Sequence, residues 1–328
     1  MENAFVSAKR LFVGATVISV LGFLSALNAE AAGNEPIRVW GHGHRGQDYI
    51  LTLVKSWQGA YTGTHPEAKF DNELYGDASA MGGLWTGNAD IAIIDREPNF
   101  TEADGYQQGT GSIPFGIPIA RGSVGIAKHA PALIVYVNQA NPLTQLRAEQ
   151  LDGILDADHL LNDRRLRTWG DVGLTGKWRD RPIRIYTFAV QSEQVQFLER
   201  AAMKGSRKFS GNLRTKTTAA AIAAAVRADE YGIGILDSLV IGVRAVPIAP
   251  LGNPRAVLAT RETISAGTYP LAHTIYAYVN RTGNSVPTDV ANFLRFVVSS
   301  EGQDIVKGTG QYLPLSPEMD AAAREALK

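Results

Sequence analysis

Short hydrophobic runs alternate along the chain with segments in which hydrophobic residues recur every three or four positions. The runs Ile91–Ile94, Leu133–Val137 and Gly232–Leu236 have the length and continuity of strands that are covered on both faces. The segment Tyr49–Trp57 has the spacing of one buried helix face. Because strands and helices alternate throughout, the pattern predicts an α/β fold.

The other predicted elements continue this alternation. Asn99–Gly116 is rich in Gly, Gln, Thr and Pro, and it is predicted to be a loop. Ala245–Leu251 is predicted to be extended. The remaining strands are predicted at Ile37–Trp40, Ala68–Leu74, Ile117–Ile119, Ile183–Tyr186 and Ala272–Val279, and the remaining helices from Ser79, from Thr144 to Leu155, over Gln191–Lys204, from Thr217 or Thr218 to Asp229, from Thr288 and near Gln303–Val306.

The stretch Ala68–Pro98 forms a predicted strand–turn–helix–turn–strand unit, and such units are right-handed. Its geometry places the helix N-terminus, Asp77–Ala80, at the sheet edge where Asp95 and Arg96 follow the second strand. Open α/β sheets bind ligands at this edge, and a helix N-terminus favours anions. We therefore expect a binding site for a small anion here.

A glycine-rich loop, Gly41–Arg45, follows the first predicted strand and should reach the same edge. His42 and His44 flank a glycine in it, but a metal site needs further ligands. The remaining histidines are scattered, and the sequence contains no HExxH motif and no cysteine. Contact with an anion, or simple polarity of the loop, is therefore favoured over metal binding, and no metal is expected.

The middle of the chain contains its own set of strands and helices, and extended segments precede and follow it. This organisation predicts a second lobe over residues 132–249, inserted into a first lobe made of residues 32–131 and 250–328. The two crossings are expected near Gly116–Val137 and Ala245–Leu251. Two lobes joined by two extended crossings form a hinge and a cleft.

The N-terminal residues are predicted to be a secretory signal peptide, residues 1–31, which directs the protein to the periplasm. Lys9 and Arg10 precede the apolar run Leu11–Leu24, and Ala29–Ala31 has the small-x-small pattern of a cleavage site. The alternative is a membrane anchor, but the run is shorter than the ~20 residues that a spanning helix needs. With no cysteine in the chain, a lipid anchor on Cys and disulfides are excluded.

Composition and motifs narrow the function. The formal net charge is +0 and no block of Lys or Arg occurs, so nucleic-acid binding has no support. No GxSxG, P-loop or GxGxxG motif is present. We therefore expect a binding protein that is not an enzyme, uses no cofactor and is a monomer.

Four segments resemble the periplasmic phosphate-binding proteins of bacterial phosphate ABC importers. They read VYVNQANPLTQLRAEQLDGIL from Val135, TWGDVGLTGKWRDRPIRIY from Thr168, YGIGIL from Tyr231 and YPLAHTIYAYVN from Tyr269. The resemblance covers essentially the whole mature chain in the same order. It implies the two-lobed type II periplasmic binding fold, a cleft that closes on a small oxyanion, and an ABC permease as partner.

The resemblance also implies a set of binding residues. The family grips phosphate with a loop after the first strand, with a Ser at a helix N-terminus, with an Asp after the next strand, and with a turn before a helix of the second lobe. The matching residues here are Gly43, His44, Arg45, Ser79, Asp95 with its neighbour Arg96, Thr187 and Ser192.

The second-lobe turn departs from the family pattern. The family has a Ser-Gly-Thr turn with a nearby Arg, whereas this chain reads TFAVQSE over Thr187–Glu193. Glu193 places a negative charge at a helix N-terminus that should attract an anion. This departure predicts weak phosphate binding, or a different and larger ligand. A non-transport sensory or binding protein on the same scaffold is the alternative function.

Overall fold

The structure is a computed structural model that describes residues 35–43, 50–206, 208–211, 213–283 and 285–328. The predicted signal peptide and two predicted site residues, His44 and Arg45, lie outside the described residues. Within these ranges, no helix has both the length and the apolar character that crossing a bilayer requires.

Both ends of the chain build the first of two five-stranded sheets, whose order is β2-β1-β3-β12-β4. Strand β1 runs parallel to β2 and β3, whereas β12 is antiparallel to β3 and β4. The first strand and the strand predicted at Ala272–Val279 therefore lie in the same sheet. The bounds are β1 Ile37–Gly41, β2 Phe70–Glu73, β3 Ile91–Ile94, β4 Phe115–Arg121 and β12 Thr274–Val279.

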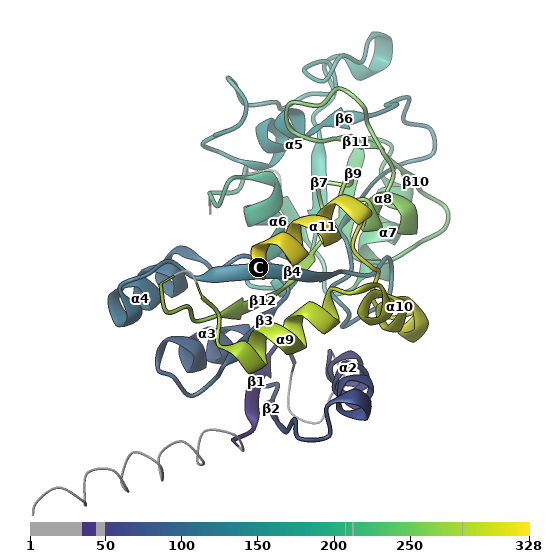
Figure 1. The fold of residues 1–328 in the computed structure, drawn as a ribbon. Helices are drawn as coiled ribbons and strands as arrows, with labels where there is room; N and C mark the ends of the chain where they lie inside the picture. Colours follow the sequence, from purple (N-terminus) through teal and green to yellow (C-terminus); the bar gives the residue numbers. More distant parts are fainter. Residues whose placement is uncertain (1–34, 44–49, 207, 212, 284) are drawn as a thin grey trace, which may run out of the picture.

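Six helices cover this sheet and complete the first lobe (Figure 1). Apolar side chains of the strands and helices form one core, which includes Val39 of β1, Leu53 of α2 and Phe293 of α9. The C-terminal helices thus pack against the N-terminal part of the chain. The helix bounds are α2 Leu51–Thr64, α3 Asp77–Trp85, α4 Phe100–Thr110, α9 Thr288–Val297, α10 Ser300–Thr309 and α11 Pro317–Ala326.

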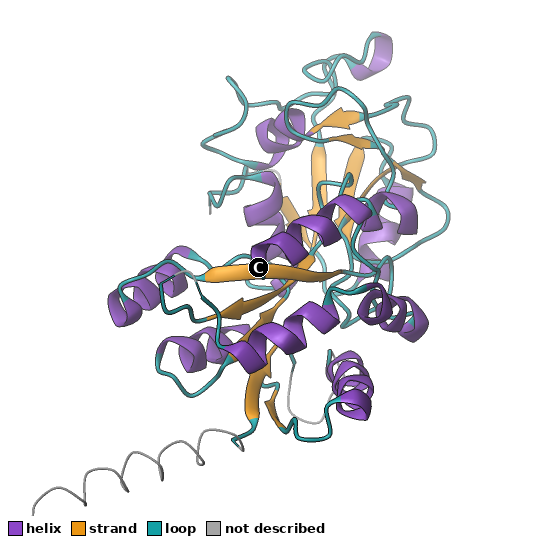
Figure 2. Ribbon diagram, in the orientation of Figure 1, coloured by secondary structure: helices purple, strands orange, loops and turns teal. Residues whose placement is uncertain are grey.

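The second sheet has the order β10-β5-β9-β7-β8 and belongs to the second lobe, in the upper half of Figure 2. Its core contains Val135, Leu198 and Trp169, all fully buried. A two-stranded sheet of β6 and β11 lies beside it. The bounds are β5 Ile134–Val137, β6 Leu146–Arg147, α5 Ala148–Leu155, η1 Gly176–Trp178, β7 Arg184–Thr187, α6 Glu193–Ala202, β8 Leu213–Thr215, α7 Ala219–Ala228, β9 Gly232–Leu236, β10 Arg244–Ala245, β11 Ile248–Ala249 and α8 Arg261–Ser265.

Two neighbouring segments, residues 122–133 and 271–273, join the lobes. The amide of Gly122 donates to the carbonyl of His273 at 3.0 Å, and the amide of Leu133 donates to that of Leu271 at 2.9 Å. The return crossing therefore comes later than the expected Ala245–Leu251. That segment instead adds β11 to the second lobe, and Leu271 still packs in the second-lobe core.

Two helices differ from their predictions for local reasons. Residues 99–110 were expected to be a loop, but α4 forms there because Asn99 and Glu102 make a reciprocal capping box and Tyr106 is buried. Helix α5 begins at Ala148 rather than at Thr144, because Leu146–Arg147 pairs with β11 first.

Helix α3 begins two residues earlier than expected, at Asp77. Gly76 is its N-cap and has φ 138°, a backbone conformation that only glycine adopts readily. Ser79 therefore lies inside the first turn, where its hydroxyl donates to the carbonyl of Gly76 at 2.8 Å. As a consequence, the side chain that begins this helix is the carboxylate of Asp77.

Candidate functional site

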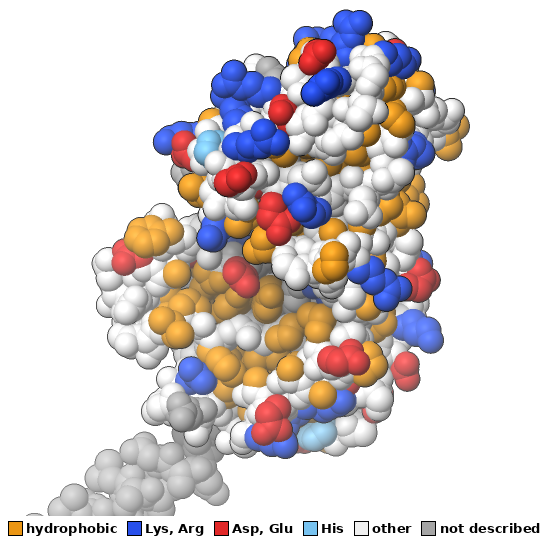
Figure 3. All heavy atoms as spheres, turned by 90° about the horizontal axis from the view of Figure 1, so that it is seen from above, with side chains coloured by type: hydrophobic (Ala, Val, Ile, Leu, Met, Phe, Trp, Pro, Cys, Tyr) orange, Lys and Arg blue, Asp and Glu red, His pale blue; other side chains and the backbone are white. Residues whose placement is uncertain are grey.

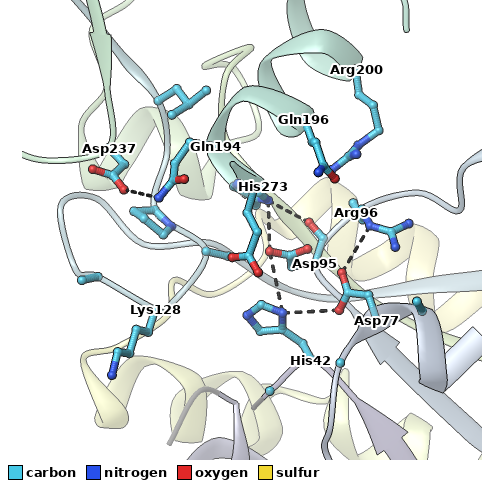
Figure 4. A pocket seen from close by; sticks show the side chains of 18 of the residues that line it. His42, Asp77, Asp95, Arg96, Lys128, Gln194, Gln196, Arg200, Asp237 and His273 are labelled. Atoms are coloured by element: carbon cyan, nitrogen blue, oxygen red, sulfur yellow. Dashed lines mark hydrogen bonds and ion pairs between the residues drawn. The ribbon is translucent and has the colours of Figure 1, made fainter. Parts of the chain in front are cut away.

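A cavity of about 590 Å³ lies between the lobes. The first lobe contributes the loop after β1, the N-terminus of α3 and the residues after β3. The second lobe contributes the N-terminal part of α6. The crossing segments contribute further lining residues, among them Lys128 and His273. Figure 4 labels ten of the side chains that line it, which are His42, Asp77, Asp95, Arg96, Lys128, Gln194, Gln196, Arg200, Asp237 and His273.

Two carboxylates and an imidazole meet on the first-lobe wall. Nδ1 of His42 lies 3.3 Å from Oδ1 of Asp77 and 3.9 Å from Oδ2 of Asp95, and each side chain is at most 15% exposed. Three separate elements bring them together: the end of β1, the start of α3 and the end of β3. The predicted unit Ala68–Pro98 does place its helix N-terminus beside the residues that follow β3.

The three groups shift one another's protonation. Burial raises the pKa of Asp77 to about 6, and the charge of Asp95 adds to this effect. Burial also opposes ionisation of Asp95, but His273, His42 and Arg96 lower its pKa to about 2. Burial disfavours the charged form of His42, yet Asp95 and Asp77 together raise its pKa to about 9. At neutral pH, His42 is therefore a cation between two carboxylates.

Arg96 is bound by carboxylates of its own lobe. It donates to both oxygens of Glu102, at 2.6 and 2.7 Å, and its Nε lies 3.3 Å from Oδ2 of Asp77. Glu102 in turn accepts from the amide of Asn99 at the start of α4. These contacts fix the guanidinium in place, and they leave it less able to bind an anion than the sequence indicated.

His273 connects the cluster to the second lobe. Its Nδ1 lies 2.9 Å from the backbone oxygen of Asp95 and 3.4 Å from Oδ2 of the same residue. Its ring stacks on Phe197 of α6, with 3.6 Å between the ring centroids. Burial lowers the pKa of His273, so at neutral pH the ring is neutral and Nδ1–H donates to the backbone oxygen.

Arg200 is the main cationic group of the second-lobe wall. It lies on α6, one turn beyond Gln196, and its buried Nε has no hydrogen-bond partner among the residues that the structure describes. Burial lowers the pKa of its guanidinium, although the group remains charged at neutral pH. A half-buried guanidinium with an unused donor is a ready partner for an oxyanion.

The two helices that point into the cavity both begin with a carboxylate. Asp77 is the first residue of α3, and Glu193 is the first residue of α6. A helix N-terminus carries a partial positive charge, which a carboxylate at this position offsets. Asp237 adds a further carboxylate to the lining and accepts from Gln194 at 3.0 Å.

The structure places the residues expected from the sequence in three groups. Gly43, Ser79, Asp95 and Arg96 line the cavity. His44 and Arg45 lie outside the described residues. Thr187 and Ser192 are not among the lining residues: the Thr187 hydroxyl donates to the Ile235 carbonyl at 3.1 Å, and the Ser192 hydroxyl caps α6 by accepting from the Val195 amide at 3.3 Å.

Several lining residues went unrecognised in the sequence. Gln196 and Arg200 could have been found, because they share one face of the helix predicted over Gln191–Lys204. Lys128 belongs to a crossing segment without a recognised motif, whereas His273 lies within the segment YPLAHTIYAYVN, whose resemblance to the family gave the histidine no role. Lys128 also has a φ of 67°, which the sequence around it does not indicate.

Comparisons with known proteins agree on one kind of molecule. Residues 45–301 match a family model described as PBP superfamily domain. The phosphate-binding protein PstS of Pseudomonas aeruginosa is 29% identical over 289 residues, which cover 86% of this chain and 84% of that protein.

Solved structures share the fold. PstS from Borrelia burgdorferi has a TM-score of 0.61 and 18% identity, and the match covers 86% of this chain and 100% of that one. An ABC-type phosphate transport receptor from Vibrio cholerae has a TM-score of 0.54 and 20% identity, with coverage of 84% and 99%. At these identities the likeness shows the two-lobed fold.

Proposed function

The chain belongs to the PBP superfamily, and on this premise we propose that it is a periplasmic solute-binding protein that captures phosphate or a related small oxyanion for an ABC importer. Similarity to a phosphate-binding protein over most of both chains supports the ligand class. The proposed site is the cavity between the lobes. Export would depend on residues 1–31 acting as the signal peptide.

One observation carries the proposal: the half-buried side chain of Arg200 lines the cavity, and its buried Nε lacks a partner among the described residues. The first turn of α3, where Ser79 lies, supplies helix N-terminal amides on the opposite wall. An oxyanion between these walls would receive donors from both lobes. Capture would then proceed by rotation of the lobes about residues 122–133 and 271–273.

The carboxylates of the cavity favour a second candidate, a sensory or binding protein on the same scaffold with a different ligand. Asp77, Asp95, Glu193 and Asp237 all line the space that phosphate would occupy. Phosphate is repelled by such groups, whereas hydroxyl, amine or metal ligands are not. In a non-transport role, the lobes would not need to bind a permease.

Isothermal titration calorimetry with phosphate tests the proposed function. We expect one site per chain with a dissociation constant in the micromolar range or weaker. This corresponds to a binding free energy that is no more favourable than about −8 kcal/mol. Sulfate is the comparison anion. Absence of any heat or thermal stabilisation at about 1 mM phosphate would contradict the ligand assignment, whereas a submicromolar constant would contradict the weakening attributed to the second-lobe turn.

Substitution of Glu193 by Gln is expected to strengthen phosphate binding by about three- to tenfold. The change removes a negative charge from the N-terminus of α6 but keeps the side-chain length, and the gain is modest because solvent screens this exposed group. Calorimetry at two salt concentrations measures it. The control is Glu230→Gln, which removes a second-lobe carboxylate paired with Lys177 and absent from the cavity lining. Equal effects of both variants would contradict the expectation.

A further inference from the structure

The cluster of His42, Asp77 and Asp95 also offers the kinds of ligand atom that a metal ion takes. Nδ1 of the histidine and one oxygen of each carboxylate all lie within 4.8 Å of one another. Each comes from a different segment of the first lobe, so the convergence results from the fold and not from proximity in the sequence. One imidazole nitrogen and two carboxylate oxygens are a donor set for a divalent metal ion.

One spacing between these atoms matches that around a shared ion, and the other is about half an ångström longer. Ligand atoms at about 2.0–2.1 Å from a tetrahedral ion lie about 3.3–3.4 Å apart. His42 Nδ1 and Asp77 Oδ1 are 3.3 Å apart, and His42 Nδ1 and Asp95 Oδ2 are 3.9 Å apart. Oδ1 of Asp77 is buried, and His42 is the described group that it faces most closely in the cluster.

Outer groups hold both carboxylates in orientation. Nε of Arg96 lies 3.3 Å from Oδ2 of Asp77, which leaves Oδ1 directed to the cluster, and Glu102 fixes Arg96 in turn. Nδ1 of His273 lies 3.4 Å from Oδ2 of Asp95. Metal sites depend on such outer partners, which orient the ligands before the ion binds. Figure 4 shows the contacts of Arg96 with Asp77 and of His273 with Asp95, joined through His42.

The second lobe faces the cluster with another carboxylate. Glu193 begins α6 and lines the same cavity. Closure of the cleft would bring this oxygen towards the three first-lobe ligands. A fourth ligand is what a tetrahedral site requires.

We propose that His42, Asp77 and Asp95 bind a divalent transition-metal ion of the Zn²⁺ type in the cleft, and that Glu193 supplies the fourth ligand when the lobes close. The imidazole ligand favours Zn²⁺ over Mg²⁺, which prefers six oxygen ligands. The competing explanation is a structural ion pair in which the His42 imidazolium bridges the two aspartates. The site stands independently of phosphate binding.

The test uses untagged protein that has been treated with a chelator and transferred to metal-free buffer. Calorimetry with ZnCl₂ alone, and metal analysis after gel filtration, are expected to give one Zn²⁺ per chain, with much weaker binding of Mg²⁺. Asp77→Asn and His42→Ala should each weaken Zn²⁺ binding by at least about 100-fold, since each removes a direct ligand. Failure to retain Zn²⁺, or retention unchanged in both variants, would overturn the proposal.

Two control variants test whether Zn²⁺ binds at this cluster rather than at other side chains. Asp237→Asn removes a cavity carboxylate outside the cluster, and His159→Gln removes a histidine of the second lobe, so neither should change Zn²⁺ binding. If the cluster variants do not fold, a crystal of the wild-type protein soaked with Zn²⁺ decides the question. An anomalous peak between the three ligands supports the site, whereas a peak only elsewhere overturns it. Phosphate calorimetry in the same metal-free buffer tests the proposed function separately.

Discussion

Replacement of Arg200 by alanine is expected to reduce phosphate affinity by about tenfold to 100-fold. The guanidinium lines the cavity, and its buried Nε has no partner among the described residues. Each charge-assisted hydrogen bond that it donates to an oxyanion contributes ~1.5–3 kcal/mol, and 1.4 kcal/mol corresponds to a factor of ten. Calorimetry with phosphate measures the loss.

Two further variants define the role of Arg200. Arg200→Lys keeps the charge but cannot present two parallel donors, so its affinity should lie between those of the wild type and the alanine variant. Arg214→Ala removes an exposed second-lobe arginine that stacks over Tyr186 outside the cavity, and it should leave affinity unchanged. If Arg200→Ala binds phosphate as the wild type does, the anion does not lie on this wall.

Replacement of Trp57 by alanine is expected to lower the free energy of unfolding by about 3–5 kcal/mol. The indole is 1% exposed in the core of the first lobe. Its Nε1 also donates to the backbone oxygen of Gly302 at 2.9 Å, which links α2 to α10 near the other end of the chain. Urea unfolding followed by circular dichroism measures the change.

The variant Trp57→Phe separates packing from hydrogen bonding. It keeps most of the buried volume but removes the donor to Gly302, so we expect a loss of about 1–3 kcal/mol, the cost of a buried carbonyl without a partner. A loss below about 1 kcal/mol for Trp57→Ala would show that this core relaxes around the missing side chain.

Elements with a complete local signal were predicted closely. The continuous apolar runs at β3 and β9 have the same bounds in the sequence and in the structure, and Thr218, one of the two predicted starts, caps α7. Their signals lie within a few neighbouring residues, namely an uninterrupted apolar run or a hydroxyl before a helical repeat. Helix α4 was missed because its glycines and threonines conceal the capping box.

The site was predicted less completely, because half of it depends on the hinge. The sequence identified the first-lobe edge with Asp95 and Arg96, since both follow a buried strand. It did not indicate that Glu102 binds Arg96, or that His273 reaches Asp95 across 178 residues. Glu102 lies in a segment predicted to be a loop and His273 in a predicted strand, and only tertiary packing brings them to Arg96 and Asp95.

Charged side chains of both signs are mixed on the surface, in keeping with a formal net charge of +0. Figure 3 shows acidic and basic side chains interspersed at one end of the molecule, and hydrophobic side chains gathered in the middle of the same face. The formal net charge is +0, so attraction of an anion depends on a few groups in the cleft rather than on the field of the whole protein.

The position of β12 has a consequence for the order of folding. This strand lies between β3 and β4 in the first sheet, although almost the whole second lobe separates it from them in the sequence. The strands of the second sheet all lie within residues 134–245 and close over shorter loops, which cost less entropy. During synthesis the second sheet can therefore form while β3 and β4 still lack their common neighbour, and the first lobe becomes stable only after the last quarter of the chain has emerged.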